Sequence, residues 1–465
     1  MSRPGCLLTC AALFVSAISP QVVSAQAEKR PAIAAAAELF RLFGMDEDFF
    51  EKFRDGESWN DDEQEPLARA LVRLAQIKPA DLARWTARDI QPSDIADQPR
   101  EFSGRILRLQ GQVRRVTVVQ APAGERDRYD LQKYYRCEIE LENSGGAAAI
   151  FALNVPEHWQ PNAPIDESAS ADALFLKRGP EEKAGGPMLY FAADRVAWHP
   201  DTLLGKLGMD CGLFDTVQHD RGISDSEREC FYQLLAAAGR APAQAMDEAA
   251  VNAAAEKDAE PTARLVRLMA QPDAHEGELH SFRGVARRAV KILVNDAETV
   301  ARFGLDHYFE LVVFVDLDGY AKIGGKKVTN HPVVFCLREL PAGMPTGENI
   351  AEMVRASGFV FKKWRYTTQL MGEKGVGVRV ASPLLIGKTA VWERREMALR
   401  RINPIVGGVV IVALVCIVFF AWWYSRRERR MHNAVLAGRR TIADRVSLDD
   451  LQRDSIDDAT DVQRD

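Results

Sequence analysis

The sequence predicts an α+β protein of two tandem repeats, each a helical hairpin followed by a five-stranded β-barrel, plus one C-terminal transmembrane helix. Three observations predict this fold class. The chain resembles itself over two long blocks, the later part of each block alternates apolar and polar residues, and one C-terminal run of 21 residues carries no charge. A chain of 465 residues allows roughly two to four domains.

Residues 1–25 are typical of a secretory signal peptide. Arg3 precedes an apolar stretch from Leu7 to Ile18, and Val23-Ser24-Ala25 stands before Gln26, so we expect cleavage after Ala25 or Ala27. An uncleaved anchor is the alternative, because Arg3 is the only charge before the apolar stretch. Export places the residues that follow, up to about residue 400, outside the cytoplasm.

The duplication is clearest in the helical regions, which we assign to residues 30–100 and 201–278. Residues 39–71 align without a gap on residues 203–235, and nine positions are identical, including a whole Gly-Met-Asp. An Ala-rich stretch near the end of the second region indicates an insertion in that copy.

Each helical region has the pattern of a hairpin. Apolar residues on both sides of Gly44 predict short first helices. Asn60 with Glu63, and Ser224 with Glu227, have the spacing of a capping box, which predicts that a longer helix begins there in each copy.

Each hairpin precedes a block with the pattern of β structure, residues 101–200 in the first copy and 279–393 in the second. The two blocks align at an offset of 180 through Phe102-Ser103-Gly104 and Phe282-Arg283-Gly284. This alignment requires sixteen more residues before the second block than the hairpin offset of 164 does. The strands predicted in the first copy are 106–119, 134–141, 147–155, 171–177 and 188–198. Residues 156–170 are predicted to be a polar connection.

The stretches Phe102 to Gly111 and Arg355 to Val360 resemble the glycine-marked first and fourth strands of OB-fold barrels. Five strands with a long first strand and a long connection before the fourth also fit that family. The resemblance covers two copies and implies a fold, but no activity or ligand residue. A small SH3-like barrel is the structural alternative.

Residues 404–424 predict a transmembrane helix, because 21 residues at 1.5 Å each reach about 31 Å, the thickness of a hydrocarbon core. Aromatic residues and then arginines follow it, and residues 425–465 form a tail that is basic first and acidic at its end. With the signal peptide, this predicts a single-pass inner-membrane protein with a periplasmic ectodomain and a cytoplasmic C-terminus.

The remaining motifs indicate no catalytic residues, no metal site and no cofactor. His275 and His280 are five residues apart rather than four, and Pro272 and Gly277 favour a loop over a zinc-binding helix. Among the exported cysteines we expect Cys211 and Cys230 to form a disulfide that joins the two arms of the second hairpin.

One cluster of cations and aromatic residues is a candidate ligand site in the second barrel. It consists of Lys362, Lys363, Trp364, Arg365 and Tyr366. Strand alternation interleaves charge and rings on its faces, which could hold an oligosaccharide or a nucleic acid strand, whereas the alternative is that the rings close the barrel.

These observations predict a non-enzymatic binding or scaffolding protein of the bacterial cell envelope, with the membrane and a protein or glycan as partners. The alternatives are an enzyme or cofactor carrier with a site between the repeats, and ligand binding by the second barrel. The net charge of −6, from 60 basic and 66 acidic residues, argues against nucleic acid as a partner.

Overall fold

The computed structural model describes residues 36–88, 90–142, 146–182, 186–256, 260–323, 326–371, 377–394, 411–424 and 426. The chain divides into two compact units, residues 1–393 and 394–465, and both predicted repeats lie in the first unit. The predicted signal peptide and nearly all of the predicted cytoplasmic tail lie outside the described residues.

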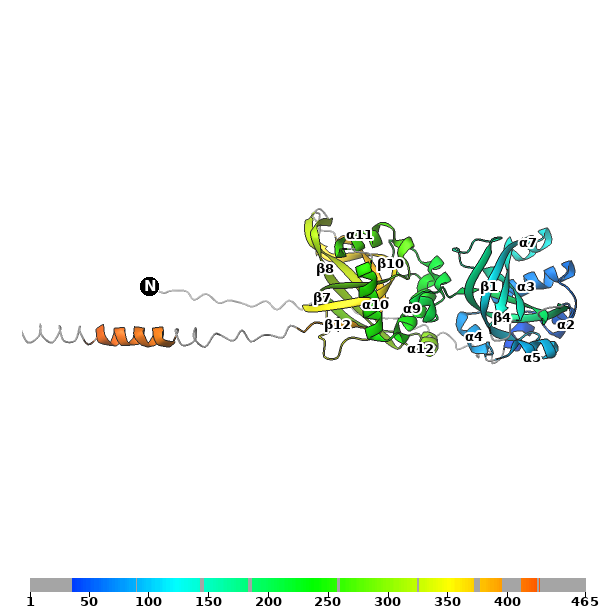
Figure 1. The fold of residues 1–465 in the computed structure, drawn as a ribbon, viewed down its shortest axis with the longest axis horizontal. Coiled ribbons are helices and arrows are strands. Elements are labelled where there is room, and N and C mark those ends of the chain that lie inside the picture. The colour runs from blue at the N-terminus through cyan, green and yellow to red at the C-terminus, as the bar shows by residue number, and fades with distance from the viewer. Residues whose placement is uncertain are drawn as a thin grey trace, which may run out of the picture. The chain divides into compact units, whose positions relative to one another are not determined.

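The first repeat has its helices before its strands, apart from one helix between β1 and β2 (Figure 1). Its helices are α1 (Ala36–Leu42), α2 (Glu47–Phe50), η1 (Asp61–Glu63), α3 (Gln64–Leu74), α4 (Pro79–Trp85), α5 (Pro92–Asp97), α6 (Pro99–Phe102) and α7 (Ala123–Tyr129). Its strands are β1 (Ile106–Gln120), β2 (Lys133–Leu141), β3 (Ala147–Asn154), β4 (Pro164–Glu182), β5 (Gly186–Arg195) and β6 (Ala197–Trp198).

The second repeat has the same order of elements. Its helices are α8 (Leu203–Lys206), η2 (Cys211–Thr216), η3 (Asp225–Glu227), α9 (Arg228–Arg240), α10 (Ala243–Glu256), α11 (Pro261–Ala270), η4 (Pro272–His275) and α12 (Ala297–Phe303). Its strands are β7 (Leu279–Leu293), β8 (His307–Ile323), β9 (Lys326–Leu337), β10 (Glu352–Met371), β11 (Gly377–Gly387) and β12 (Ala390–Trp392).

The second sheet is a closed barrel of five strands. Its order is β11-β9-β8-β7-β10, and β10 pairs back to β11. The first sheet has the equivalent pairings, in the order β1-β2-β3-β5-β4, with β1 also paired to β4. In both sheets one neighbouring pair is parallel, β3 with β5 and β9 with β11, and the other pairs are antiparallel.

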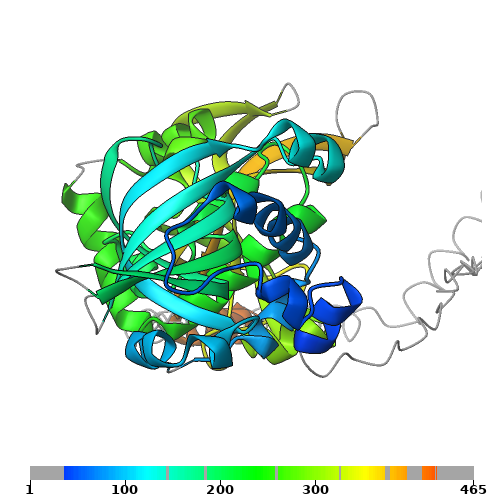
Figure 2. The same cartoon turned by 90° about the vertical axis from the view of Figure 1, so that its right-hand side faces the viewer.

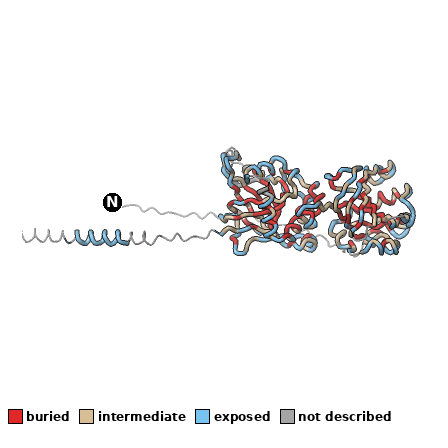
Figure 3. The backbone as a smooth tube through the Cα atoms, viewed as in Figure 1, coloured by how far each residue is buried: buried red, intermediate tan, exposed pale blue. Residues whose placement is uncertain are grey.

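Two hydrophobic clusters form in each repeat, one inside the sheet and one between the sheet and the helical hairpin. Buried residues run through both repeats (Figure 3). Ile95 of α5 and Leu268 of α11 each belong to the cluster inside their own sheet. The long hairpin helix packs outside, with Leu71 of α3 and Leu235 of α9 buried against the strands. Figure 2 shows the N-terminal helices lying across the curved strands of the first sheet.

The predicted hairpin features are confirmed. Asn60 with Glu63 and Ser224 with Glu227 both form capping boxes, and a helix follows each one directly. Gly44 is one of the residues with positive φ, at 69°, which explains why the first helix stops at Leu42 and a separate short helix begins at Glu47.

The structure corrects the alignment of the two β blocks, which is offset by 173 rather than 180. Gly104 and Gly277 both have positive φ, 73° and 72°, and they donate their N–H groups to equivalent residues of the fourth strand, Phe175 and Val360. The strand pairing agrees, since Gly111, and not Gly104, is the counterpart of Gly284. The predicted offset matched a Phe-x-Gly pattern that lies before β1 in the first copy and within β7 in the second.

The predicted polar connection 156–170 is also partly wrong. β4 already begins at Pro164, because its first residues pair with the far half of the long strand β1, up to Arg115. Alternation did not reveal this part of the strand, because most of its residues are polar or small.

No helix among the described residues is long and apolar enough to cross a membrane. Of the predicted span 404–424, the structure describes residues 411–424 as helix with every residue exposed, and the first seven residues lie outside the described part.

Candidate functional site

Comparing equivalent positions of the two repeats distinguishes side chains that both share, and that the fold requires, from side chains found in one repeat. Lys177 of β4 and Lys362 of β10 are equivalent, and both side chains are fully buried. Lys177 Nζ lies 2.6 Å from Glu63 Oε1, and Lys362 Nζ lies 2.6 Å from Glu227 Oε1. Each glutamate also accepts the main-chain N–H of the residue that caps the following helix. These lysines therefore fasten the fourth strand of the sheet to the hairpin in both repeats.

The predicted ligand residues of β10 do not form one surface. Lys362 is inaccessible because it is buried against Glu227. Trp364 and Tyr366 have ring centroids 4.9 Å apart and pack against the hydrophobic cluster under α9. Lys363 and Arg365 both contact the carboxylate of Asp220, at 3.1 and 2.8 Å. Ligand binding by the accessible members stays a prediction.

The predicted disulfide is absent from the structure. Cys211 and Cys230 are both free thiols, buried in the same hydrophobic cluster. Burial raises the pKa of Cys211 to about 12, with the nearby Asp210 carboxylate acting in the same direction. Both residues therefore act as small apolar side chains of the hairpin core.

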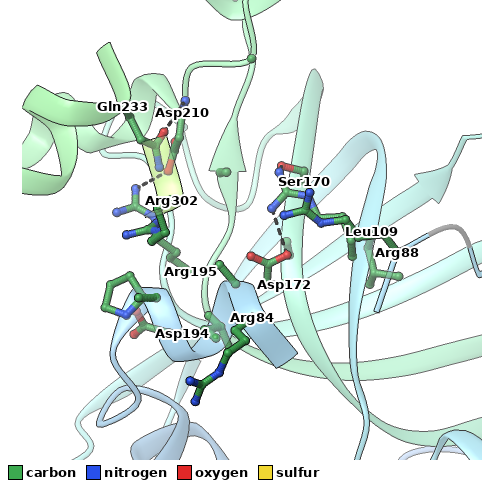
Figure 4. A pocket seen from close by; sticks show the side chains of 18 of the residues that line it. Arg84, Arg88, Leu109, Ser170, Asp172, Asp194, Arg195, Asp210, Gln233 and Arg302 are labelled. Carbon is green, nitrogen blue, oxygen red and sulfur yellow. Dashed lines mark hydrogen bonds and ion pairs between the residues drawn. The ribbon is translucent and has the colours of Figure 1, made fainter. Parts of the chain in front are cut away.

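A cleft of about 1360 Å³ lies between the two repeats (Figure 4). On one side, residues of α4, β1 and β4 line it, and on the other side residues of α9 and α12 do. Six arginines and seven carboxylates line the cleft, so its charge is nearly balanced. They are Arg84, Arg88, Arg108, Arg195, Arg240 and Arg302, and Asp81, Glu142, Asp172, Asp194, Asp210, Glu229 and Glu298.

Asp210 joins the two repeats at the edge of the cleft. Its carboxylate lies 2.9 Å from Arg195 Nη2 at the end of β5, and it accepts the N–H groups of Trp198 and Gly212, both at 3.0 Å. The counterpart in the first repeat, Asp46, accepts only the local N–H of Phe49 at 3.2 Å. The aspartate of the shared Gly-Met-Asp thus caps a helix in both copies, and in the second copy it also contacts the first repeat.

A chain of hydrogen bonds crosses the same joint through His199. Its Nδ1 lies 2.8 Å from the Met209 carbonyl oxygen, and its Nε2 lies 2.7 Å from Ser170 Oγ. Because a carbonyl only accepts, Nδ1 carries the hydrogen and Nε2 accepts from the serine hydroxyl. Arg108 donates to Ser170 Oγ at 2.8 Å and to Asp172 at 3.1 Å.

The environment of the joint shifts two of its titratable groups. Burial lowers the pKa of His199 and the Arg108 charge adds to this, while the Met209 hydrogen bond opposes it. Burial raises the pKa of Asp194, against the opposing effects of Arg195 and a hydrogen bond from Asn154. Ser170 and His199 have the arrangement of a nucleophile and a base, but Ser170 is fully buried and its hydroxyl is committed to the joint.

A second polar group lies in the second repeat, at the turn before β7, and the described part of the first repeat has no equivalent. His219 Nε2 lies 2.9 Å from Asp273 and 3.2 Å from Glu276, which is close enough for three ligands of one metal ion. However, His219 Nδ1 accepts the N–H of Lys363 at 3.1 Å. The ring hydrogen must then be on Nε2, so this nitrogen has no lone pair for a metal. The group is therefore a histidine that faces two carboxylates.

Sequence reasoning found Asp210 through the repeat but did not pair Ser170 with His199. They are 29 residues apart and meet only because β6 folds back beside β4. No protein-family model matches this chain, and no curated protein does either. The function therefore has to be argued from the geometry.

Proposed function

We propose that the chain is a membrane-anchored, non-enzymatic binding or scaffolding protein of the bacterial envelope, and that the cleft between its repeats is the binding surface. The observation that carries this is the cleft itself, because residues of both repeats line it and eight of its thirteen charged side chains are already in ion pairs. Because ion pairs already hold these side chains in place, less of their conformational entropy is lost when a partner binds.

The balanced charge of the cleft supports a polypeptide segment as its occupant. A nucleic acid would require an excess of cations, and the carboxylates here outnumber the arginines by one. Paired arginines and carboxylates beside apolar residues such as Leu109 and Phe303 suit a mixed polar and apolar protein surface.

We further propose that both repeats are OB-like barrels and that residues 404–424 cross the membrane. The pairing order of the first sheet, with β1 joined to β4 and β3 parallel to β5, supports the first point. The charge-free run in the sequence supports the second. Reporter fusions at the C-terminus test the topology. A reporter that is active only in the cytoplasm is expected to be active when it is fused to the C-terminus.

Site-specific photo-crosslinking in intact cells tests the cleft. Crosslinkers replace Arg88 on the first repeat and Glu298 on the second, both of which are exposed on the walls. The matched control is Arg126 of α7, which is also exposed but lies outside the cleft lining. The same discrete adduct is expected from both wall positions and not from Arg126. Equal labelling at all three positions would contradict a cleft-specific partner.

An enzyme with a site between the repeats is the second candidate, and the contact between Ser170 and His199 favours it. An acyl-transfer role predicts that a fluorophosphonate probe labels wild type and not Ser170→Ala. The structural role predicts no labelling in either, because the serine is buried.

A further inference from the structure

We propose that the turn before β7 holds a divalent transition-metal site, with Zn²⁺ as its best-suited ion and His275, Glu278 and His280 as its ligands. His275 Nδ1 lies 2.9 Å from Glu278 Oε2, and His280 Nε2 lies 3.1 Å from the same oxygen. Two imidazoles and one carboxylate are a donor set that Zn²⁺ takes in proteins, with a position left for water.

The loop that argued against a zinc helix is what brings these side chains together. η4 ends at His275, Gly277 turns the chain with a φ of 72°, and β7 begins at Leu279. The turn places histidines five residues apart on either side of one carboxylate, with ring centroids 6.4 Å apart. A helix has that proximity at a spacing of three or four residues, which explains why the helical motif did not apply.

The first repeat shows that the fold does not need these residues. Gln98-Pro99 and Gln271-Pro272 begin equivalent short helices with nearly the same Gln dihedrals, −131° and 58° against −133° and 61°. With Gly104 matching Gly277, the three ligands correspond to Phe102, Arg105 and Leu107.

In that repeat the three positions serve packing. Phe102 and Leu107 are buried in the cluster inside the first sheet, and the Arg105 guanidinium lies 5.5 Å from the Phe102 ring centroid. The second repeat has replaced an apolar and cation–π contact with two histidines around a carboxylate on the same backbone.

The hydrogen-bond pattern leaves these two rings able to bind a metal. Each contacted nitrogen faces a carboxylate, which accepts, so each carries a hydrogen. The ring releases that nitrogen for a metal by moving the hydrogen to its other nitrogen, a change of tautomer. His219 cannot do this, because the Lys363 N–H already points at its Nδ1.

The ligands must close on the ion, and the side chains have room to do so. The two nitrogens lie more than 4.8 Å but no more than about 6 Å apart, since both contact one oxygen, whereas Zn–N distances are about 2.0–2.1 Å. The Glu278 side chain is 34% exposed, against 18% and 11% for His275 and His280. The carboxylate can therefore swing toward solvent as the rings approach the ion, and water can fill the open position.

The test is Zn²⁺ binding by the full-length protein in detergent, after metal is removed with a chelator. Competition with a fluorescent zinc indicator measures the affinity, and native mass spectrometry measures the stoichiometry. One Zn²⁺ is expected for wild type. His275→Phe/His280→Leu, which installs the residues of the first repeat, is expected to weaken binding at least about a hundredfold, since it removes two ligands.

The matched control is Glu276→Ser, the first-repeat residue at the neighbouring position, and it is expected to bind Zn²⁺ like wild type. The single variants His275→Gln and His280→Gln serve if the double variant does not fold, and each is expected to bind at least about tenfold more weakly. Wild-type binding no tighter than that of the double variant would overturn the proposal. Loss in Glu276→Ser with retention in His280→Gln would also overturn it, since the ligands would then be the group around His219.

Discussion

Replacing Lys362 with methionine is expected to destabilise the second repeat strongly, although sequence alternation places this lysine on a surface. Methionine keeps the apolar stem and removes only the ammonium group. That group lies 2.6 Å from Glu227 Oε1 and 3.1 Å from the Gly222 carbonyl oxygen, and both charged side chains are fully buried. The substitution therefore leaves a buried carboxylate without its cation.

The expected loss is about 3–5 kcal/mol, the cost of removing one partner from a buried ion pair. The Glu227 carboxylate still accepts two main-chain N–H groups, from Gln218 at 2.7 Å and Ser224 at 2.6 Å. These hydrogen bonds favour a loss at the lower end of that range. The double variant Lys362→Met/Glu227→Gln removes both charges. Its loss is expected to be smaller than the sum of the single losses by about 0.5–3 kcal/mol.

Lys363→Met is the matched control, with the same substitution one residue further along the strand. Lys363 Nζ lies 3.1 Å from Asp220, and this pair is partly exposed, so a loss of only about 0–1 kcal/mol is expected. Urea unfolding followed by far-UV circular dichroism measures the losses. A loss for Lys362→Met within about 1 kcal/mol of the control would refute the argument that a desolvated charge pair holds strand and hairpin together.

Three further outcomes are expected. Gly111→Ala should lower the free energy of unfolding by more than about 3 kcal/mol, because its new Cβ would clash with the main-chain carbonyl of Glu140 in β2. Gly124→Ala, on a helix with open space around it, should raise the free energy of unfolding by about 0.5–1 kcal/mol. Thermal unfolding of both variants and wild type measures the difference. Wild-type stability should fall as the pH drops below about 6.5 toward the lowered pKa of folded His199, since the unfolded chain takes up the proton first. His199→Gln should lack this pH-dependent part of the stability. Urea titrations at several pH values measure it. Cys211 and Cys230 should resist maleimide in the native protein and react after unfolding; labelling of either in the native state would contradict their burial.

Local and periodic features of the fold could be predicted from the sequence. The capping boxes at Asn60 and Ser224 depend on residues three positions apart, and the structure has both. The hairpin duplication was visible because identical residues cap and pack the same helices in both copies. The transmembrane helix stays a prediction, made from an uninterrupted apolar run in the sequence.

The tertiary structure decided which polar residues are accessible. Lys362 and Lys363 look alike in the sequence, but a β-bulge between Val360 and Lys362 and the capping glutamate turn the first into a buried structural group. Strand periodicity assigns a face and cannot tell whether a helix covers that face. The predicted ligand cluster failed at Lys362 for this reason.

The cleft and the joint through His199 also depend on contacts distant in sequence. Ser170 and His199 meet across 29 residues, and the cleft needs walls from α4 and α12, more than 200 residues apart. The sequence by itself determined the hairpin helices, their capping boxes and the approximate order of the strands, because these follow from neighbours within a few positions. Only the folded chain decided the register of the two sheets, the buried charges and the meeting of the repeats, because these arise from strand pairing and desolvation between distant segments.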